Sequence, residues 1–335
     1  MNIGVFGAGS LGMFVGGRLA NSGESVTMVG RLGSEIAQHG LTLTDIHGGR
    51  VALAPARVPY TERIERLSGC DVVLVTVKSM ATERAGALLA PVLRRSACVI
   101  SLQNGTSNGT TLRRTLPGHP VLEAIATFNV VRKGPGALHQ GTAGRVVIEN
   151  NSVGRRIAAS FIKAGIRAAL DDDIRPVLWS KLLFNLNNPI NALAGISLRE
   201  ELAQRAFRSV LANSMREGLA ALRAAGIRPR RIGGWIPRLT PPILSLPDCL
   251  YSRLADVLLP IDPHARSSMW EDLDRRRPTE IEHLNGAIVE LGTRQGTPTP
   301  VNRRVRDLVL AAEMKRQGSP MLRGEDLLAE VSRVA

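Results

Sequence analysis

Residues 1–12 read MNIGVFGAGSLG, and this stretch decides the fold of the first half of the chain. The apolar run up to Phe6 predicts a strand, and GAGSLG matches the pattern G-x-G-x-x-G directly after it. In this context Gly7 permits a tight turn, Gly9 lets the backbone approach a pyrophosphate, and Gly12 lets a helix pack closely on a strand. The pattern therefore predicts a dinucleotide at a helix N-terminus. The predicted cofactor-binding residues of this loop are Gly7, Ala8, Gly9, Ser10, Leu11 and Gly12.

Beyond residues 1–12, the first half of the chain alternates short apolar runs, typical of strands, with amphipathic helical patterns. Runs rich in valine and isoleucine lie at residues 25–29, 71–77 and 98–102. This alternation predicts a parallel, doubly wound sheet. Further strands are predicted at 121–131 and 146–149, with the glycine-rich stretch between them forming a hairpin-like extension of the sheet.

The character of the sequence changes after the three consecutive aspartates at 171–173. Helical patterns follow at residues 174–196, 199–226, 265–295 and 301–317, while the proline- and glycine-rich stretch 228–247 predicts a loop or short helices. The predicted fold is thus α/β, with an N-terminal Rossmann-type doubly wound sheet followed by an all-α C-terminal domain. Residues 1–172 are predicted to bind NADP, and residues 173–335 to form the helical substrate and catalytic domain.

Composition excludes several classes of function. Hydrophobic residues make up 44% and charged residues 21% of the 335, which is typical of a globular protein. The net charge is +14, but the arginines are scattered and no long basic tail exists, so neither a nucleic-acid partner nor a membrane partner is expected. The three cysteines lie far apart, which predicts reduced thiols in a cytoplasmic protein and no metal site.

The end of the second strand favours one dinucleotide over the other. NAD sites usually carry an acidic residue there for the ribose hydroxyls, whereas this chain has Gly30 and Arg31. Because a guanidinium suits a 2′-phosphate, NADP(H) is the predicted cofactor. Lys78 ends the strand at 71–77 and is predicted to add a second charge. Asn104 follows the strand at 98–102 and is either a turn residue or a contact of the nicotinamide and substrate.

Residues 179–193, WSKLLFNLNNPINAL, place polar side chains in an apolar helix. At 3.6 residues per turn, Lys181, Asn185 and Asn188 fall within about 60° of one another, and Asn191 lies at the margin of that face. Pro189 is expected to kink the helix or to free a carbonyl group. A lysine in apolar surroundings has a lowered pKa and suits proton transfer. The alternative is a lysine whose ammonium reaches solvent, with capping asparagines.

Residues 267–286, SSMWEDLDRRRPTEIEHLNG, form a second candidate segment, with serines before a helical pattern and Glu280 among apolar residues. Together with GAGSLG, Arg31, Lys78, Asn104 and the W-x-K-L-x-x-N helix, this segment resembles the ketopantoate reductases (2-dehydropantoate 2-reductases). The motifs match in order and approximate spacing from residue 3 to about residue 310, including TPTPVN at 297–302.

The resemblance implies NADPH-dependent reduction of ketopantoate to (R)-pantoate, in pantothenate and coenzyme A synthesis. By position, Lys181 matches the catalytic lysine and Glu280 the second essential polar residue, which binds the substrate hydroxyl. Ser268 matches a contact near the substrate carboxylate, and Asn104 a residue beside the nicotinamide. The resemblance assigns substrate binding to Asn104, Asn185 and Ser268, and leaves Asn188 and Asn191 as candidates for one further asparagine.

Two departures from the family pattern leave alternatives open. Pro189 stands eight residues after the lysine, where the family usually has its second helix asparagine, and the segment 228–264 is long and rich in proline. A related reductase of another 2-keto acid is therefore an alternative. A dinucleotide-binding sensor without catalysis is another, but a sensor has no need of Lys181 and Glu280. A homodimer through the helical domain is a hypothesis only.

Overall fold

The computed structural model describes residues 1–251, 253 and 265–334, and it divides the chain into two compact units. The first unit is Met1–Leu178 and the second is Trp179–Ala335. The sequence placed the boundary after residue 172. The contacts of the chain place the division six residues later, within the first helix of the second half.

The first unit contains an eight-stranded sheet of order β12-β11-β8-β7-β6-β1-β2-β5. Neighbouring strands are parallel except for β8 and β11, which are antiparallel. The strands are β1 (Asn2–Phe6), β2 (Ser25–Val29), β5 (Tyr60–Thr61), β6 (Val72–Val75), β7 (Cys98–Leu102), β8 (Val121–Ala126), β11 (Val146–Glu149) and β12 (Ala168–Asp171).

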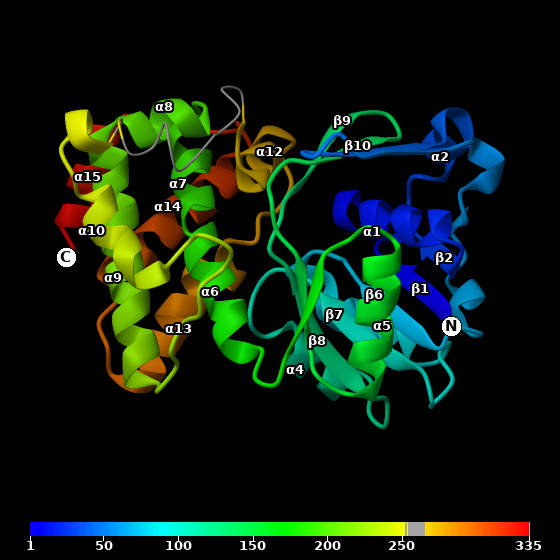
Figure 1. The fold of residues 1–335 in the computed structure, drawn as a ribbon. Helices are drawn as coiled ribbons and strands as arrows, with labels where there is room; N and C mark the ends of the chain where they lie inside the picture. The colour runs from blue at the N-terminus through cyan, green and yellow to red at the C-terminus, as the bar shows by residue number, and fades with distance from the viewer. Residues whose placement is uncertain (252, 254–264, 335) are drawn as a thin grey trace. The chain divides into compact units, whose positions relative to one another are not determined.

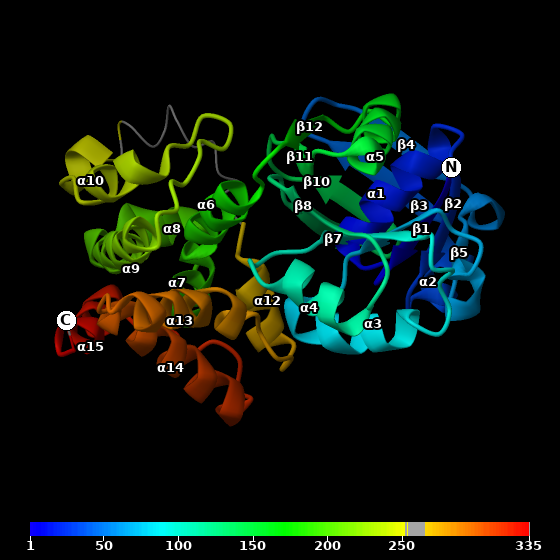
Figure 2. The same cartoon turned by 90° about the horizontal axis from the view of Figure 1, so that it is seen from below.

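Helices cover both faces of this sheet (Figure 1, Figure 2). Val72 and Leu74 of β6 point into a core shared with α1 (Ser10–Asn21) and α5 (Ser152–Lys163). Val73 and Val75 point to the opposite face, into a core shared with α3 (Thr82–Leu89) and α4 (Asn108–Thr115). Because successive strand residues face opposite sides, one apolar strand serves both cores. The predicted doubly wound sheet is confirmed.

A second sheet, of order β4-β3-β10-β9, corrects one sequence prediction. Its strands are β3 (Leu41–Asp45), β4 (Arg50–Leu53), β9 (Val130–Gly134) and β10 (Ala137–Gln140). The predicted single strand at 121–131 is wrong, because the chain leaves the large sheet after β8 and enters the small one at β9. The β9–β10 hairpin pairs with β3, so it does not extend the large sheet.

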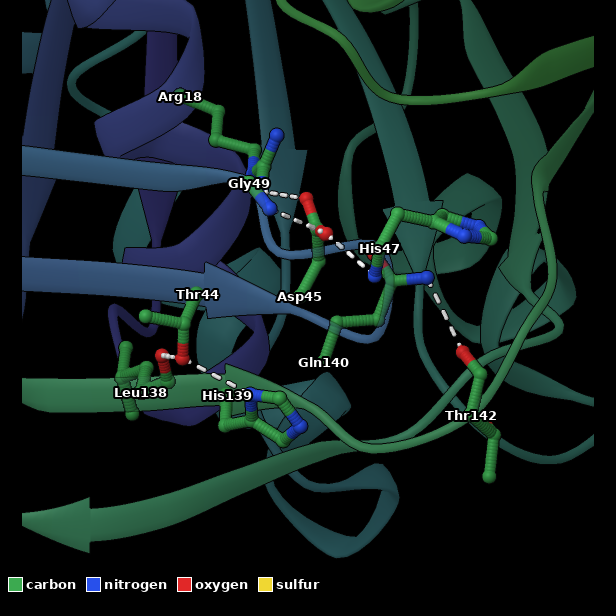
Figure 3. Close-up of polar contacts among 9 residues, drawn as sticks. All are labelled: Arg18, Thr44, Asp45, His47, Gly49, Leu138, His139, Gln140 and Thr142. Carbon is green, nitrogen blue, oxygen red and sulfur yellow. Dashed lines mark hydrogen bonds and ion pairs between the residues drawn. The ribbon is translucent and has the colours of Figure 1, made fainter. Parts of the chain in front are cut away.

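Helix α1 lies between the two sheets (Figure 1). A Cβ atom on Gly17 of this helix would come 2.5 Å from the Leu41 side chain of β3, so the small sheet packs directly on it. Arg18 of α1 forms an ion pair with Asp45 at the end of β3, with 2.5 Å between Nη2 and Oδ2. The backbone N–H groups of His47 and Gly49 also donate to Asp45 (Figure 3). This cluster fastens the β3–β4 turn to α1.

The second unit is helical, as predicted, and its helices share one apolar core. Its described α-helices include α6 (Arg175–Asn185), which begins in the first unit, α7 (Asn187–Ala194), α8 (Leu198–Ala203), α9 (Arg205–Ala224), α10 (Thr240–Leu244), α12 (Ser268–Asp274), α13 (Asn285–Gln295), α14 (Pro300–Lys315) and α15 (Gly324–Ser332). Other short helices in the described part of the chain include α2 (Gly33–His39), η1 (Pro55–Arg57), η2 (Ile64–Leu67), η3 (Ser79–Ala81), η4 (Pro237–Leu239) and η5 (Ile281–His283).

The helix predicted at 265–295 is wrong in its continuity. The chain forms α12, a non-helical stretch around Pro278, then η5 and α13. Pro278 lacks the N–H group that a helix interior needs, and Arg276 has a positive φ of 54°. Residues 228–247 form η4 and α10 with connecting loops, as expected. In the described part of the chain, no helix has both the length and the apolar character needed to cross a membrane.

Candidate functional site

The glycine loop adopts the backbone that a pyrophosphate site requires. Gly7 has φ of 90°, and a Cβ atom there would lie 2.7 Å from the backbone nitrogen of Val77. A Cβ atom on Gly12 would lie 2.5 Å from Oγ1 of Thr76, so only glycine lets α1 pack this close to the end of β6. At Gly9 the nearest atom would be 3.8 Å away, which leaves the outer side of the loop open to a ligand.

The N-terminus of α1 offers backbone donors at the same place. Gly9 is its N-cap, no side chain caps it, and its first turn has no acidic residue. Ala8 is 2% exposed, and its N–H group donates to the carbonyl oxygen of Val29 at 2.9 Å, which ties the loop to β2. Ser10 and Leu11 are partly exposed in the first helical turn. Uncapped N–H groups at the positive end of a helix favour a phosphate, so these residues fit a dinucleotide.

Arg31 lies exposed on the loop between β2 and α2. Tyr60 of β5 supports this loop, because the N–H group of Leu32 donates to its hydroxyl oxygen at 3.0 Å. A Cβ atom on Gly30 would come 2.1 Å from the same hydroxyl oxygen, so the loop packs directly against the hydroxyl end of the Tyr60 side chain. Tyr60 therefore holds the backbone of the loop on both sides of Arg31, while Arg31 itself is exposed to solvent.

Lys78 and Asn104 follow β6 and β7 and are both half-buried. Sequence reasoning missed the buried side chains that hold these two loops together. Ser79 donates to the carbonyl oxygen of Asn104 at 2.7 Å, and Asn108 donates to the same oxygen at 2.5 Å. Gln103 donates to the carbonyl oxygen of Val77 at 3.0 Å. The sequence did offer a signal for these contacts, because residues with amide and hydroxyl side chains follow the carboxyl ends of the neighbouring strands β6 and β7.

The polar helix at 174–196 is two helices, α6 and α7, which meet at Leu186. Pro189 is the third residue of α7, where the N–H group of a helix has no partner within the helix. The proline is therefore tolerated without loss of a hydrogen bond, and the interruption comes three residues before it. Lys181 and Asn185 belong to α6, whereas Asn188 and Asn191 belong to α7, so the predicted stripe is not one continuous helix face.

Lys181 is buried, with 3% of its surface exposed. Its Nζ atom lies 4.9 Å from the centre of the Phe184 ring, and that ring packs edge-on against Trp235. Burial lowers the pKa of Lys181 to about 8. The sequence also allowed a lysine whose ammonium reaches solvent. That alternative requires an exposed ammonium, so it does not fit the buried side chain of Lys181. Asn185, one turn further on, is also buried.

The two candidate asparagines of α7 differ in what their side chains contact. Asn191 is 0% exposed, and its amide binds the Ile196 carbonyl, the Glu201 carboxyl and the Ser267 N–H group. These bonds favour a positioning role over the substrate contact proposed for Asn191 from the sequence. Asn188 is half-buried, and no hydrogen bond of its side-chain amide is found within the described residues. Asn188 is therefore the better candidate for a substrate contact.

Ser268 and Glu280 belong to the segment that contains α12 and η5. Ser268 is exposed and is the first residue of α12. Glu280 is half-buried and directly precedes η5. Thr279 is held in place because its N–H group donates to Glu313 of α14 at 2.8 Å.

Sequence reasoning also missed Glu201, which is completely buried in α8. Burial raises the pKa of its carboxyl to about 8, against the lowering effect of hydrogen bonds from Asn191 and Asn187. This carboxyl accounts for Asn187, which binds it from the same helix as Asn191. Elsewhere in the described residues, no group of three or more histidine, cysteine, aspartate or glutamate side chains is arranged to hold a metal ion.

An open glycine loop at the end of a Rossmann-type strand and a buried lysine in a helical unit fit the class of dinucleotide-dependent oxidoreductases. Family models described as "Ketopantoate reductase PanE/ApbA" and "Ketopantoate reductase PanE/ApbA C terminal" match residues 3–153 and 173–313. A 2-dehydropantoate 2-reductase of Mesorhizobium japonicum is 29% identical over 94% of this chain and 99% of its own length.

Solved structures agree with this class. A PanE/ApbA family ketopantoate reductase from Ralstonia eutropha JMP134 has a TM-score of 0.80 and 32% identity, covering 95% of this chain and all of its own. A D-mandelate dehydrogenase solved with NADH and anilino(oxo)acetate has a TM-score of 0.77 over 94% of this chain and 99% of its own, at 20% identity, which is a likeness of fold alone. The chain belongs to the ketopantoate reductase family.

Proposed function

We propose that this protein reduces 2-dehydropantoate to (R)-pantoate with NADPH, in the cytoplasmic synthesis of pantothenate and coenzyme A. The observation that carries the proposal is Lys181, a buried ammonium with its pKa lowered to about 8 in the helix that matches the family. The first unit would bind the cofactor and the second the keto acid. The open glycine loop and the uncapped N-terminus of α1 fit a dinucleotide pyrophosphate.

Lys181 is proposed to act on the ketone oxygen. Bound NADPH supplies the hydride that the 2-keto carbon accepts. Negative charge then develops on the ketone oxygen, where the Lys181 ammonium donates a hydrogen bond and finally its proton. An ammonium in a buried site interacts more strongly with the developing charge than with the neutral ketone, so it lowers the barrier.

The remaining polar residues are proposed to orient the substrate. Glu280 accepts a hydrogen bond from the substrate hydroxyl, and Ser268 donates to the carboxylate. Asn185 and Asn188 bind the same keto acid. Asn104, held by Ser79 and Asn108, contacts the nicotinamide side of the substrate. Such positioning contributes to rate by fixing the reacting atoms before the chemical step.

The cofactor preference is proposed to depend on Arg31. We expect Arg31→Ala to lower kcat/KM for NADPH roughly 10- to 100-fold, the loss of one charge-assisted hydrogen bond, and to leave kcat/KM for NADH nearly unchanged. Steady-state kinetics with both cofactors measure this ratio. Arg50→Ala, at another exposed arginine of the first unit, is the control and should change neither value. A wild-type protein that prefers NADH would contradict the assignment.

The substrate is tested by following NADPH oxidation with a panel of 2-keto acids. We expect 2-dehydropantoate to have the highest kcat/KM. A higher value for another branched 2-keto acid would identify a related reductase. NADPH binding without turnover of any 2-keto acid would favour the sensor alternative.

A further inference from the structure

A chain of buried hydrogen bonds joins α7, α8 and the residue just before α12. The completely buried Glu201 accepts from Asn191, with 2.7 Å between Oε2 and Nδ2. The same nitrogen donates to the carbonyl oxygen of Ile196 at 3.0 Å. On its other side, Oδ1 of Asn191 accepts from the N–H group of Ser267 at 2.8 Å. The Asn191 amide therefore links the α7–α8 region to the start of α12.

Ser267 carries this link to two proposed substrate residues. Its hydroxyl donates to the carbonyl oxygen of Asn188 at 3.0 Å and accepts from the N–H group of Trp270 at 3.1 Å. Ser268, the next residue, opens α12. The position of Ser268 relative to Asn188 thus depends on how Ser267 is held.

The residues before Ser267 are fastened to the same turn. The N–H group of Leu198 donates to the carbonyl oxygen of Ala265 at 2.9 Å. The Arg266 guanidinium donates to the carbonyl oxygen of Gly195 at 2.6 Å and lies 4.3 Å from the centre of the Trp270 ring. Residues 265–267 therefore follow the α7–α8 turn closely.

Glu201 determines which way the Asn191 amide faces. Oε2 of Glu201 accepts from Nδ2 of Asn191, and the Ile196 carbonyl can only accept, so the NH₂ group points toward both. Oδ1 is then the only atom left for the Ser267 N–H group. Without the Glu201 acceptor, the amide has less reason to keep this orientation, and a flipped amide would direct its NH₂ group at another donor.

We propose that Asn191 and Glu201 are positioning residues of the keto-acid site, which hold Ser267 and so fix Ser268 relative to Asn188. This inference rests on the proposed function. It predicts a specific loss of keto-acid recognition when the hydrogen-bond chain is broken, because neither residue is assigned to the cofactor or to the proton transfer.

The test compares KM for 2-dehydropantoate, KM for NADPH, kcat and Tm in the full-length protein. We expect Asn191→Ala and Glu201→Leu each to raise KM for 2-dehydropantoate about 10-fold, the effect of losing a buried hydrogen bond, with KM for NADPH unchanged. Glu201→Gln keeps an oxygen acceptor for Asn191 and should restore the wild-type KM. Failure of this rescue would overturn the role given to the Glu201 acceptor.

Asn302 provides a matched control. It is 0% exposed, and its Nδ2 atom donates to Glu217 at 2.7 Å and to the carbonyl oxygen of Ser214 at 2.9 Å, in the same pattern as Asn191. Asn302→Ala should lower Tm as Asn191→Ala does, but leave KM for 2-dehydropantoate unchanged. Equal KM values in these two variants would show that Asn191 only stabilises the fold, and would overturn the inference.

Two further outcomes keep the test decisive. If Asn191→Ala does not fold, Ser267→Ala removes a single hydroxyl and should still raise KM for 2-dehydropantoate; an unchanged KM would overturn the inference. A wild-type protein that reduces no 2-keto acid would overturn the proposed function and this inference with it. Wild-type turnover together with unaffected variants would overturn this inference alone.

Discussion

Lys181→Ala is expected to lower kcat for 2-dehydropantoate roughly 10²- to 10⁴-fold, the range for loss of a positioned proton donor. The side chain is 3% exposed, so water cannot readily replace the ammonium at the ketone oxygen. The Kd for NADPH should not change, because the cofactor is assigned to the glycine loop of the first unit. Single-turnover kinetics and a fluorescence titration with NADPH measure the two quantities separately.

The pH dependence of the wild-type protein provides a second readout of the same prediction. Burial lowers the pKa of Lys181 from 10.5 to about 8, so the ammonium is present below that pH and is lost above it. We therefore expect kcat to fall as the pH rises through about 8, and this fall should be absent in Lys181→Ala. Lys315→Ala, at an exposed lysine of α14, is the control, and its kcat should show the same dependence on pH as that of the wild type. Near-normal turnover in Lys181→Ala would refute the catalytic assignment.

Glu280→Ala is expected to lower kcat/KM for 2-dehydropantoate roughly 10- to 100-fold, the effect of one charge-assisted hydrogen bond to the substrate hydroxyl. The affinity for NADPH should not change. Steady-state kinetics with 2-dehydropantoate and with the analogue that lacks the hydroxyl group measure the effect. Wild type should prefer the hydroxylated substrate, whereas the variant should treat both alike, because the group that recognises the hydroxyl is gone.

Glu282→Ala controls for the loss of a carboxylate in the same segment. Glu282 is exposed and its oxygen lies 4.0 Å from Arg306, so this variant should keep the wild-type preference. If Glu280→Ala instead abolished NADPH binding, or kept the preference for the hydroxylated substrate, the proposed place of Glu280 in the site would be wrong.

The parts of the fold that could be predicted from the sequence have strong local signals. The apolar run up to Phe6 predicted a strand, and GAGSLG predicted the turn and the helix after it. The steric reasons expected for Gly7 and Gly12 are the clashes that a Cβ atom would make at these two positions in the structure. The small sheet was missed because β3 alternates leucine with threonine and β4 begins with an arginine, so neither has a continuous apolar run like that of β6. In addition, β9 continues the apolar pattern of β8 across a change of sheet. Helix continuity at 174–196 was also overestimated, since apolar periodicity passes through the break at Leu186.

The residues of the candidate site also fall into those that the sequence could identify and those that it could not. Lys181 could be chosen from the sequence, because a lone lysine in an apolar helix is conspicuous, but the sequence left its burial open and the structure supplied it. The positioning role proposed for Asn191 could not, since it depends on Ser267, which is 76 residues away in the chain, and on a glutamate in the next helix. Residue type alone could not distinguish Asn188 from Asn191, because the difference lies in which amide the fold already uses.

The burial of α1 between two sheets has a consequence for changing the cofactor. Side chains cannot grow on the covered sides of this helix, since a Cβ atom on Gly16 would come 2.5 Å from the Met28 sulfur and one on Gly17 equally close to Leu41. Substitutions on these covered sides would therefore disturb the core. If Arg31 binds the 2′-phosphate as proposed, the exposed loop that carries it is where substitutions can change the cofactor preference without disturbing the core. Engineering libraries aimed at NADH should be built there.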